Sequence, residues 1–243
     1  MRKLEKLFRK KNIVIITCYD ATFASYLSDT DCDAILVGDS LGIVIKGESS
    51  TRKVTLNEVI YHTKAVKQGA HQIPIICDMP INTYNNKKVA LKNAKLLVDA
   101  GADIVKIEGD NNILEIVKYL SINKIPVCGH IGYMPQLNTK LKSKNHNLLR
   151  KAKNLEEAGI KMLVLSMTKP SEDKSITQNL KIPTIGFRSS NFCNGEVEVL
   201  YDLLGITKLS FSKDKNKAKK IESVDIFSRL EKFIKKIHNR KIK

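Results

Sequence analysis

The sequence predicts a (β/α)8 barrel that spans all 243 residues as a single domain. Short runs of apolar, β-branched residues alternate with longer windows of helical periodicity about eight times along the chain. The runs are apolar on both faces, as in strands buried in a parallel sheet. Repeated strand–helix units over this length favour a closed barrel. An open doubly wound sheet is the alternative, but no GxGxxG motif follows the first run.

The predicted strands are the short runs rich in β-branched residues. Three of them begin at or beside a proline (Pro74, Pro126 and Pro183), a position that a strand tolerates because the first residue need not donate a ladder hydrogen bond. The predicted strands cover residues 12–20, 34–40, 73–79, 104–109, 126–132, 162–167 and 183–187, and a weaker eighth covers 208–211.

The predicted helices lie between these strands. Apolar residues recur at helical spacing in residues 56–68, and similar windows cover 87–100, 113–120 and 148–158. Two of the windows end in an Ala–Gly pair, at Gly101 and Gly159, where glycine accepts the left-handed conformation that ends a helix. The amphipathic residues 1–10 are expected to form a helix that caps the bottom of the barrel, and the basic residues 140–153 to form a loop leading into a helix.

The chain is strongly basic. Its net charge is +17, from 42 Lys and Arg against 25 Asp and Glu, and about half of the excess lies in residues 207–243, which predict a basic C-terminal helix. Lysine greatly outnumbers arginine and few aromatic residues lie among the charges. Base recognition relies on arginine, and single-strand binding on aromatic platforms. We therefore do not expect nucleic-acid binding to be the main function.

The cysteines and the hydropathy of the sequence predict where in the cell the protein is located. The five cysteines form no CxxC pair, a pattern that fits reduced thiols in a cytosol. No window approaches the roughly 18 unbroken apolar residues of a membrane span. The basic N-terminus also lacks the apolar stretch of a secretory signal. We expect a cytoplasmic protein that does not bind membranes.

Acidic residues end three consecutive predicted strands, at Asp39, Asp78 and Glu108. In a (β/α)8 barrel the active site forms at this end of the strands, so the three carboxylates are expected to converge. They repel each other unless a cation lies among them, and a hard cation such as Mg²⁺ prefers oxygen ligands. Lys106 adds a positive charge for a carboxylate or phosphate group. Helix capping is the alternative role for each acid.

Several runs carry a family resemblance: ILVGDSLGIVIKG, CDMP, AGADIVKIEG and PVCGHIGYMPQ, in this order. From about Thr17 to Thr207 the chain resembles the ketopantoate hydroxymethyltransferase (3-methyl-2-oxobutanoate hydroxymethyltransferase) family. The resemblance implies a (β/α)8 barrel that forms a homo-oligomer and acts in pantothenate biosynthesis. It further implies that Asp39, Asp78 and Glu108 surround Mg²⁺, and that the 2-oxo acid is contacted by Asp39, Ser40, Asp78 and Lys106.

The implied reaction is an aldol-type transfer. Chelated Mg²⁺ stabilises the enolate formed when 3-methyl-2-oxobutanoate loses its C3 proton, while Lys106 offsets the charge of the substrate carboxylate. The enolate attacks the methylene carbon of 5,10-methylenetetrahydrofolate, the co-substrate. His130, on the fifth predicted strand, either contacts substrate or donates a structural hydrogen bond; the sequence favours neither.

The chain departs from the family pattern at the proton acceptor. The pattern places a glutamate at the end of the sixth strand, where this chain has Ser166. Loss of a positioned base typically costs ~10²–10⁴-fold in rate. The loops at residues 137–147 and 187–190 also differ from the family pattern, and we expect these differences to affect folate binding. The alternatives are an impaired or non-catalytic paralogue, and a related Mg²⁺-dependent barrel lyase acting on another 2-oxo acid.

Overall fold

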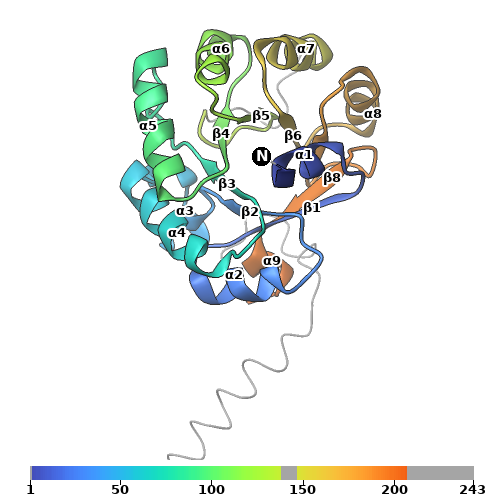
Figure 1. Cartoon of the computed structure of the whole chain (residues 1–243). Helices are drawn as coiled ribbons and strands as arrows, with labels where there is room; N and C mark the ends of the chain where they lie inside the picture. Colours follow the sequence, from blue (N-terminus) through green and yellow to red (C-terminus); the bar gives the residue numbers. More distant parts are fainter. Residues whose placement is uncertain (1, 138–146, 207–243) are drawn as a thin grey trace, which may run out of the picture.

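The computed structural model describes residues 2–137 and 147–206. Its strands form a closed barrel in the order β1 to β8, and every neighbouring pair is parallel, including β8 with β1 (Figure 1). The fold class predicted from the sequence is therefore confirmed. The strands are β1 Ile13–Thr17, β2 Ala34–Val37, β3 Ile75–Asp78, β4 Ile104–Glu108, β5 Val127–Gly132, β6 Met162–Ser166, β7 Thr184–Phe187 and β8 Gly195–Glu198.

The first seven strands lie within the predicted runs, but the eighth prediction was wrong. The barrel is closed by β8, which pairs with both β7 and β1, whereas the predicted residues 208–211 lie outside the described part of the chain. β8 escaped notice because only Val197 of its four residues is buried; two of the others are glutamates. A strand with one small, a single apolar and two acidic residues has none of the continuous apolar character used to find the others.

Helices surround the barrel and connect its strands (Figure 1). The four predicted helical windows correspond to helices, two of them with the predicted bounds. Gly101 and Gly159 end α5 and α7 with φ of 119° and 109°, as expected for a left-handed cap. The helices are α1 Arg2–Arg9, α2 Ala21–Ser28, α3 Leu41–Val44, α4 Leu56–Gly69, α5 Lys87–Ala100, α6 Leu114–Ile122, α7 Leu148–Ala158, α8 Pro170–Asn179 and α9 Leu200–Leu203, with short 3₁₀ turns at Thr51–Lys53 and Asn111–Ile113.

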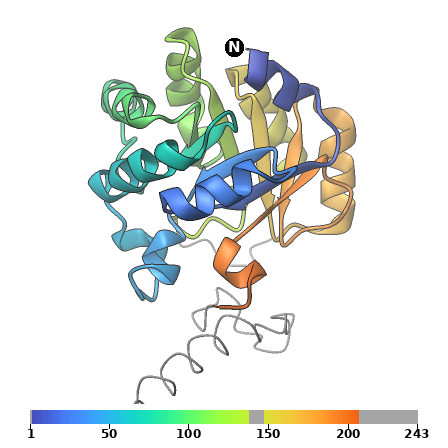
Figure 2. The ribbon, with the colours of Figure 1, turned by 60° about the horizontal axis from the view of Figure 1, so that its bottom comes forward.

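Helix α1 caps one end of the barrel, as predicted. Leu7 is 4% exposed and belongs to the apolar cluster inside the barrel, with Ile13 of β1 and Met162 of β6, while Leu4 and Phe8 pack against the same cluster. Figure 2 shows α1 at one end of the barrel and α3 and α9 at the other. The end opposite α1 is the one at which the strands terminate, so the capping helix leaves that end free for a site.

None of the helices in the described residues is long and apolar enough to cross a membrane. The predicted basic C-terminal helix lies outside the described residues, as does most of the basic loop before α7, which begins at Leu148.

Candidate active site

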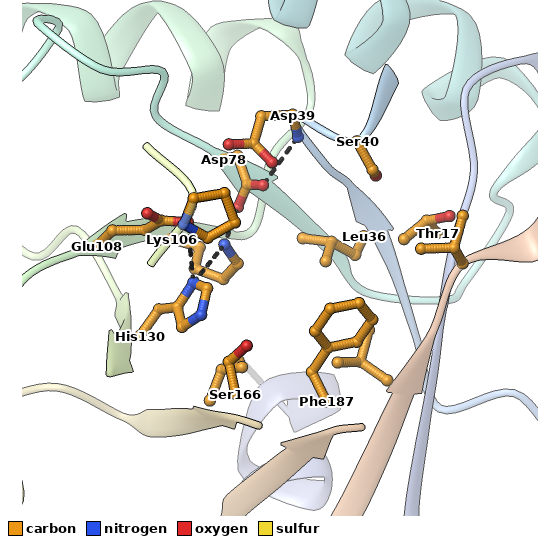
Figure 3. Close-up of a pocket in the computed structure, with 14 residues that line it drawn as sticks. Thr17, Leu36, Asp39, Ser40, Asp78, Lys106, Glu108, His130, Ser166 and Phe187 are labelled. Atoms are coloured by element: carbon orange, nitrogen blue, oxygen red, sulfur yellow. Dashed lines mark hydrogen bonds and ion pairs between the residues drawn. The ribbon is translucent and has the colours of Figure 1, made fainter. Parts of the chain in front are cut away.

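The candidate site is a cavity at the end of the barrel where the strands terminate. It encloses about 490 Å³ of empty space, part of it open to solvent. All seven site residues predicted from the sequence line it (Figure 3): Asp39, Ser40, Asp78, Lys106, Glu108, His130 and Ser166. The remaining lining residues are Thr17, Leu36, Pro135, Val164, Phe187, Val197 and Val199.

Strand register brings the polar residues together. Asp78 of β3 pairs with Lys106 of β4, and Glu108 of β4 pairs with His130 of β5. Residues two apart on a strand point to the same face, so Lys106 and Glu108 both point into the barrel. The side chains at the strand ends therefore converge in the structure, as predicted.

Asp39 and Asp78 lie side by side (Figure 3). The backbone N–H of Asp39 donates to Oδ2 of Asp78 at 2.9 Å, and Oδ1 of Asp78 forms an ion pair with Lys106 Nζ at 2.5 Å. Burial, Asp78 and Glu108 together raise the pKa of Asp39 well above its usual value. Burial alone would lower the pKa of Lys106, but the charges of Asp78, Glu108 and Asp39 outweigh burial and raise it. The site has one lysine among three buried acids.

Glu108 turns away from the other two acids and towards β5. Its Oε1 lies 3.1 Å from His130 Nδ1, and its Oε2 accepts a hydrogen bond from the backbone N–H of Gln136 at 3.0 Å. Burial alone would raise the pKa of Glu108, but His130 and Lys106 outweigh burial and lower it. Among the described residues, no group of three or more His, Cys, Asp or Glu side chains is arranged to hold a metal ion. The oxygens of Glu108 face His130 and Gln136, whereas Asp39 and Asp78 lie together as a pair.

Gln136 is a site residue that the sequence reasoning missed. Its side chain is 1% exposed and donates from Nε2 to Asp39 Oδ2 at 2.9 Å and to the Met79 carbonyl at 3.2 Å. Its Oε1 accepts from Tyr84 at 2.9 Å. One loop residue thereby links the ends of β2, β3 and β4. The available signal was its place at the end of the run PVCGHIGYMPQ, which the resemblance includes without a role for this residue.

Tyr19 was also missed. Its hydroxyl lies 2.6 Å from Ser40 Oγ and donates to Thr17 Oγ1 at 2.9 Å, and Thr17 in turn accepts from the backbone N–H of Leu200 at 3.1 Å. Tyr19 is 2% exposed, so its ring is buried while its hydroxyl contacts Ser40. The contacts join the ends of β1 and β2 to the start of α9.

The loop at 187–190 is well anchored. The Phe187 side chain lines the cavity, whereas Arg188 forms an ion pair with Asp202 at 3.0 Å. The backbone N–H and the hydroxyl of Ser190 donate to Asp173 Oδ2 of α8 at 2.9 Å and 2.7 Å. Most of the other divergent loop, 137–147, lies outside the described residues.

The opposite part of the cavity is lined mostly by apolar side chains. Figure 3 shows Asp39 and Asp78 at one end of the cavity and Ser166 and Phe187 at the other. The apolar lining consists of Leu36, Val164, Phe187, Val197 and Val199. Lys106 at the acidic end can neutralise an anionic group, and the aliphatic and aromatic side chains can contact an alkyl group. The cavity therefore has one charged end and one apolar end, and it suits a small molecule with a polar head and an apolar tail.

Comparison with solved structures shows barrels of similar fold. The structure is similar to phosphoenolpyruvate phosphomutase from Streptomyces platensis subsp. rosaceus, with a TM-score of 0.71 at 14% identity, covering 97% of this chain and 87% of that one. An identity this low concerns the fold alone. The protein is thus a (β/α)8 barrel similar in fold to that structure, with its candidate site at the end typical of barrel enzymes.

Sequence comparison gives the family. A family model described as ketopantoate hydroxymethyltransferase matches residues 1–241. The 3-methyl-2-oxobutanoate hydroxymethyltransferase of Nitrosomonas eutropha is 42% identical over 215 residues, covering 84% of this chain and 80% of the relative. That of Pelagibacter ubique is 42% identical over 218 residues, covering 86% and 84%. The chain belongs to the ketopantoate hydroxymethyltransferase family.

Proposed function

We propose that the chain transfers a one-carbon unit from 5,10-methylenetetrahydrofolate to 3-methyl-2-oxobutanoate, forming 2-dehydropantoate. The family supports the reaction class. The observation that carries the proposal is the cavity itself, in which Asp39, Asp78 and Lys106 meet at one end and an apolar lining completes the other. This matches a substrate with a 2-oxo carboxylate at one end and an isopropyl group at the other.

The Asp39–Asp78 pair fits Mg²⁺. Both residues offer carboxylate oxygens, which this hard cation prefers, and Mg²⁺ commonly takes one or two protein carboxylates together with substrate oxygens and water. Burial and the neighbouring acids Asp78 and Glu108 raise the pKa of Asp39, and a bound cation would offset the repulsion between these acids. We therefore assign Asp39 and Asp78 to the metal and Glu108 to His130. A bound Mg²⁺ would polarise the keto oxygen and so make the C3 proton more acidic.

The protein's own groups orient the substrate. Lys106 is 5% exposed and offsets the charge of the substrate carboxylate, while Ser40, held by Tyr19, offers its hydroxyl at the same end. Leu36 and Phe187 contact the isopropyl group and keep water from it.

The reaction then balances as follows. The C3 proton leaves and the C–H electron pair forms the enolate. The enolate carbon bonds to the methylene carbon, whose bonds to the folate nitrogens are replaced by this new C–C bond and by a hydroxyl group from one water molecule. The protons taken up by the two folate nitrogens come from C3 and from that water. The product keeps the 2-oxo acid and gains one hydroxymethyl group.

The cellular setting follows from the same assignment. The product is a precursor of pantothenate, and we place the protein in the cytoplasm, where the five free cysteines would remain reduced. We further propose a homo-oligomer, as the resemblance implies.

Incubation of the purified chain with both substrates and Mg²⁺ tests the proposal, with 2-dehydropantoate followed by NMR. We expect product formation that falls about 10²–10³-fold in Asp78→Asn, because this change removes a charge that acts at the reacting group. Asp29→Asn, at an exposed residue after α2, is the matched control and should leave the rate unchanged. A chain that binds the 2-oxo acid but forms no 2-dehydropantoate would instead favour another 2-oxo acid reaction, such as a lyase.

A further inference from the structure

Three buried polar atoms of cavity-lining residues have no hydrogen-bond partner within the described residues: Asp78 Oδ1, His130 Nε2 and Ser166 Oγ. Asp78 Oδ1 forms an ion pair with Lys106, which leaves His130 Nε2 and Ser166 Oγ without any partner there. The two residues are 5% and 0% exposed. A buried polar atom without a partner destabilises the protein, so atoms of this kind in a cavity are available to pair with a bound molecule.

The two atoms lie on neighbouring strands. In the register of β5 with β6, His130 pairs with Val164 and Gly132 with Ser166. Ser166 is two residues beyond Val164 on β6, so it points to the same side of the sheet, into the barrel. Figure 3 shows Ser166 next to the His130 ring, with both side chains directed into the cavity.

The position of the ring proton follows from the partners of His130 Nδ1. This atom lies 3.1 Å from Glu108 Oε1 and 3.4 Å from Lys106 Nζ. Lys106 is already paired with Asp78 at 2.5 Å, and the other oxygen of Glu108 accepts from the backbone N–H of Gln136 at 3.0 Å. The shorter contact is satisfied when Nδ1 carries the hydrogen and donates to Glu108. In the neutral ring Nε2 then has a free lone pair directed at the cavity.

We propose that His130, oriented by Glu108, is the proton acceptor of this chain. This inference rests on the proposed function and names the group that removes the C3 proton. The C3–H bond breaks, its electron pair enters the enolate, and the proton bonds to Nε2. The resulting imidazolium is paired with Glu108 and later gives its proton to a folate nitrogen or to water. His130 thereby performs the step for which the resemblance expects a glutamate at position 166.

The small side chain of Ser166 also supports His130 as the base. A carboxylate at this position would point into the same region as Nε2, and serine leaves that region open to substrate. A glutamate at position 166 and the ring of His130 would therefore each place a base in the same part of the cavity. This gives a rescue experiment that a merely structural role for His130 would not pass.

The first test concerns the ring itself and needs neither metal nor turnover. Nitrogen-15 NMR of the histidine side chains in the full chain should show His130 with a protonated Nδ1 and an unprotonated Nε2, assigned by the loss of its signals in His130→Gln. Addition of 3-methyl-2-oxobutanoate should shift the Nε2 resonance. A hydrogen on Nε2 in the neutral ring would overturn the inference.

The second test follows deuterium exchange at C3 of 3-methyl-2-oxobutanoate with Mg²⁺ and no folate. His130→Gln should slow exchange by about 10²-fold or more, while the Kd for the 2-oxo acid, measured by calorimetry, changes less than about threefold. His71→Gln, at an exposed histidine, is the matched control and should exchange like the parent chain. Adding Ser166→Glu to His130→Gln should restore exchange by at least tenfold.

The outcomes separate this inference from the proposed function. If His130→Gln exchanges as fast as the parent, His130 is not the base, and the proposed function stands. If only chains with Ser166→Glu exchange, the 2-oxo acid site is correct and the inference is overturned. If no chain binds the 2-oxo acid or exchanges its proton, both fail.

Discussion

Asp39 is a buried acid next to other acids, a position that suits metal binding but destabilises the metal-free fold. It is 7% exposed, lies next to Asp78, and is held by a hydrogen bond from Gln136. Burial and the two neighbouring acids raise its pKa. A side chain that is hard to ionise in the metal-free protein is one that a divalent cation would stabilise when bound.

We therefore predict that Asp39→Asn raises the Tm of the metal-free protein and removes the Tm increase that Mg²⁺ causes in the parent. The amide has nearly the same shape and keeps an oxygen for Gln136, but it lacks the charge that Asp78 and Glu108 repel. Each kcal/mol of relieved repulsion corresponds to about 2–4 °C in a domain of this size. Thermal unfolding with and without Mg²⁺ measures both effects.

The pH dependence of this gain has a defined sign. Because the pKa of Asp39 is raised in the folded state, the folded protein retains a proton that the unfolded chain has released. The metal-free parent is therefore destabilised as pH rises from the ordinary aspartate range through the raised pKa. The Tm difference between Asp39→Asn and the parent should grow over this range and vanish at its acidic end. A difference independent of pH would contradict the assignment.

The sequence predicted the site residues that lie at strand ends, but it did not predict those that loops bring into the site. Asp39, Asp78, Lys106 and Glu108 could be found because parallel strands end at the same edge of the barrel. Gln136 lies on a loop, and its contacts with Asp39 and Glu108 depend on the path of that loop in three dimensions. The same limit applies to Glu108, whose position was predicted but whose pairing with His130 was not.

Strand β8 is the element that closes the barrel, and it does so through close backbone contact. Gly195 pairs with Ile13 of β1 and Ile185 of β7. A Cβ added at Gly195 would lie 2.3 Å from the Ile13 carbonyl oxygen, closer than van der Waals contact allows. Glycine is therefore required for β8 to approach β1, and it also removes the apolar side chain that would have marked this strand in the sequence.

Gly195→Ala should destabilise the protein by about 3 kcal/mol or more, because the methyl group must displace the backbone of β1. Gly186→Ala on the neighbouring strand β7 is the matched control. A Cβ there would lie 3.4 Å from Ser189 Cβ and 3.5 Å from Cys193 Sγ, which is ordinary contact. The control should change the free energy of unfolding by less than about 0.5 kcal/mol. Urea unfolding measures both variants, and equal midpoints would contradict the role given to Gly195.

The two ends of the barrel have different roles: one end stabilises the fold and the other holds the candidate site. One end is closed by α1 through Leu7, Leu4 and Phe8, and the other holds the cavity with its buried charges. The strand–helix repeat and the capping helix could be predicted because apolar periodicity determines which surfaces are buried. The path of each loop and the partner of each acid follow from the assembled barrel. The net charge of +17 does not describe the cavity, where three carboxylates face one lysine.

The most direct test of the account is a crystal structure of the full chain with Mn²⁺, as an anomalous stand-in for Mg²⁺, and 3-methyl-2-oxobutanoate. We predict an anomalous peak between the carboxylates of Asp39 and Asp78, with the substrate carboxylate near Lys106 and C3 facing His130 Nε2. Metal bound elsewhere, or substrate bound with its alkyl group towards the acids, would contradict it.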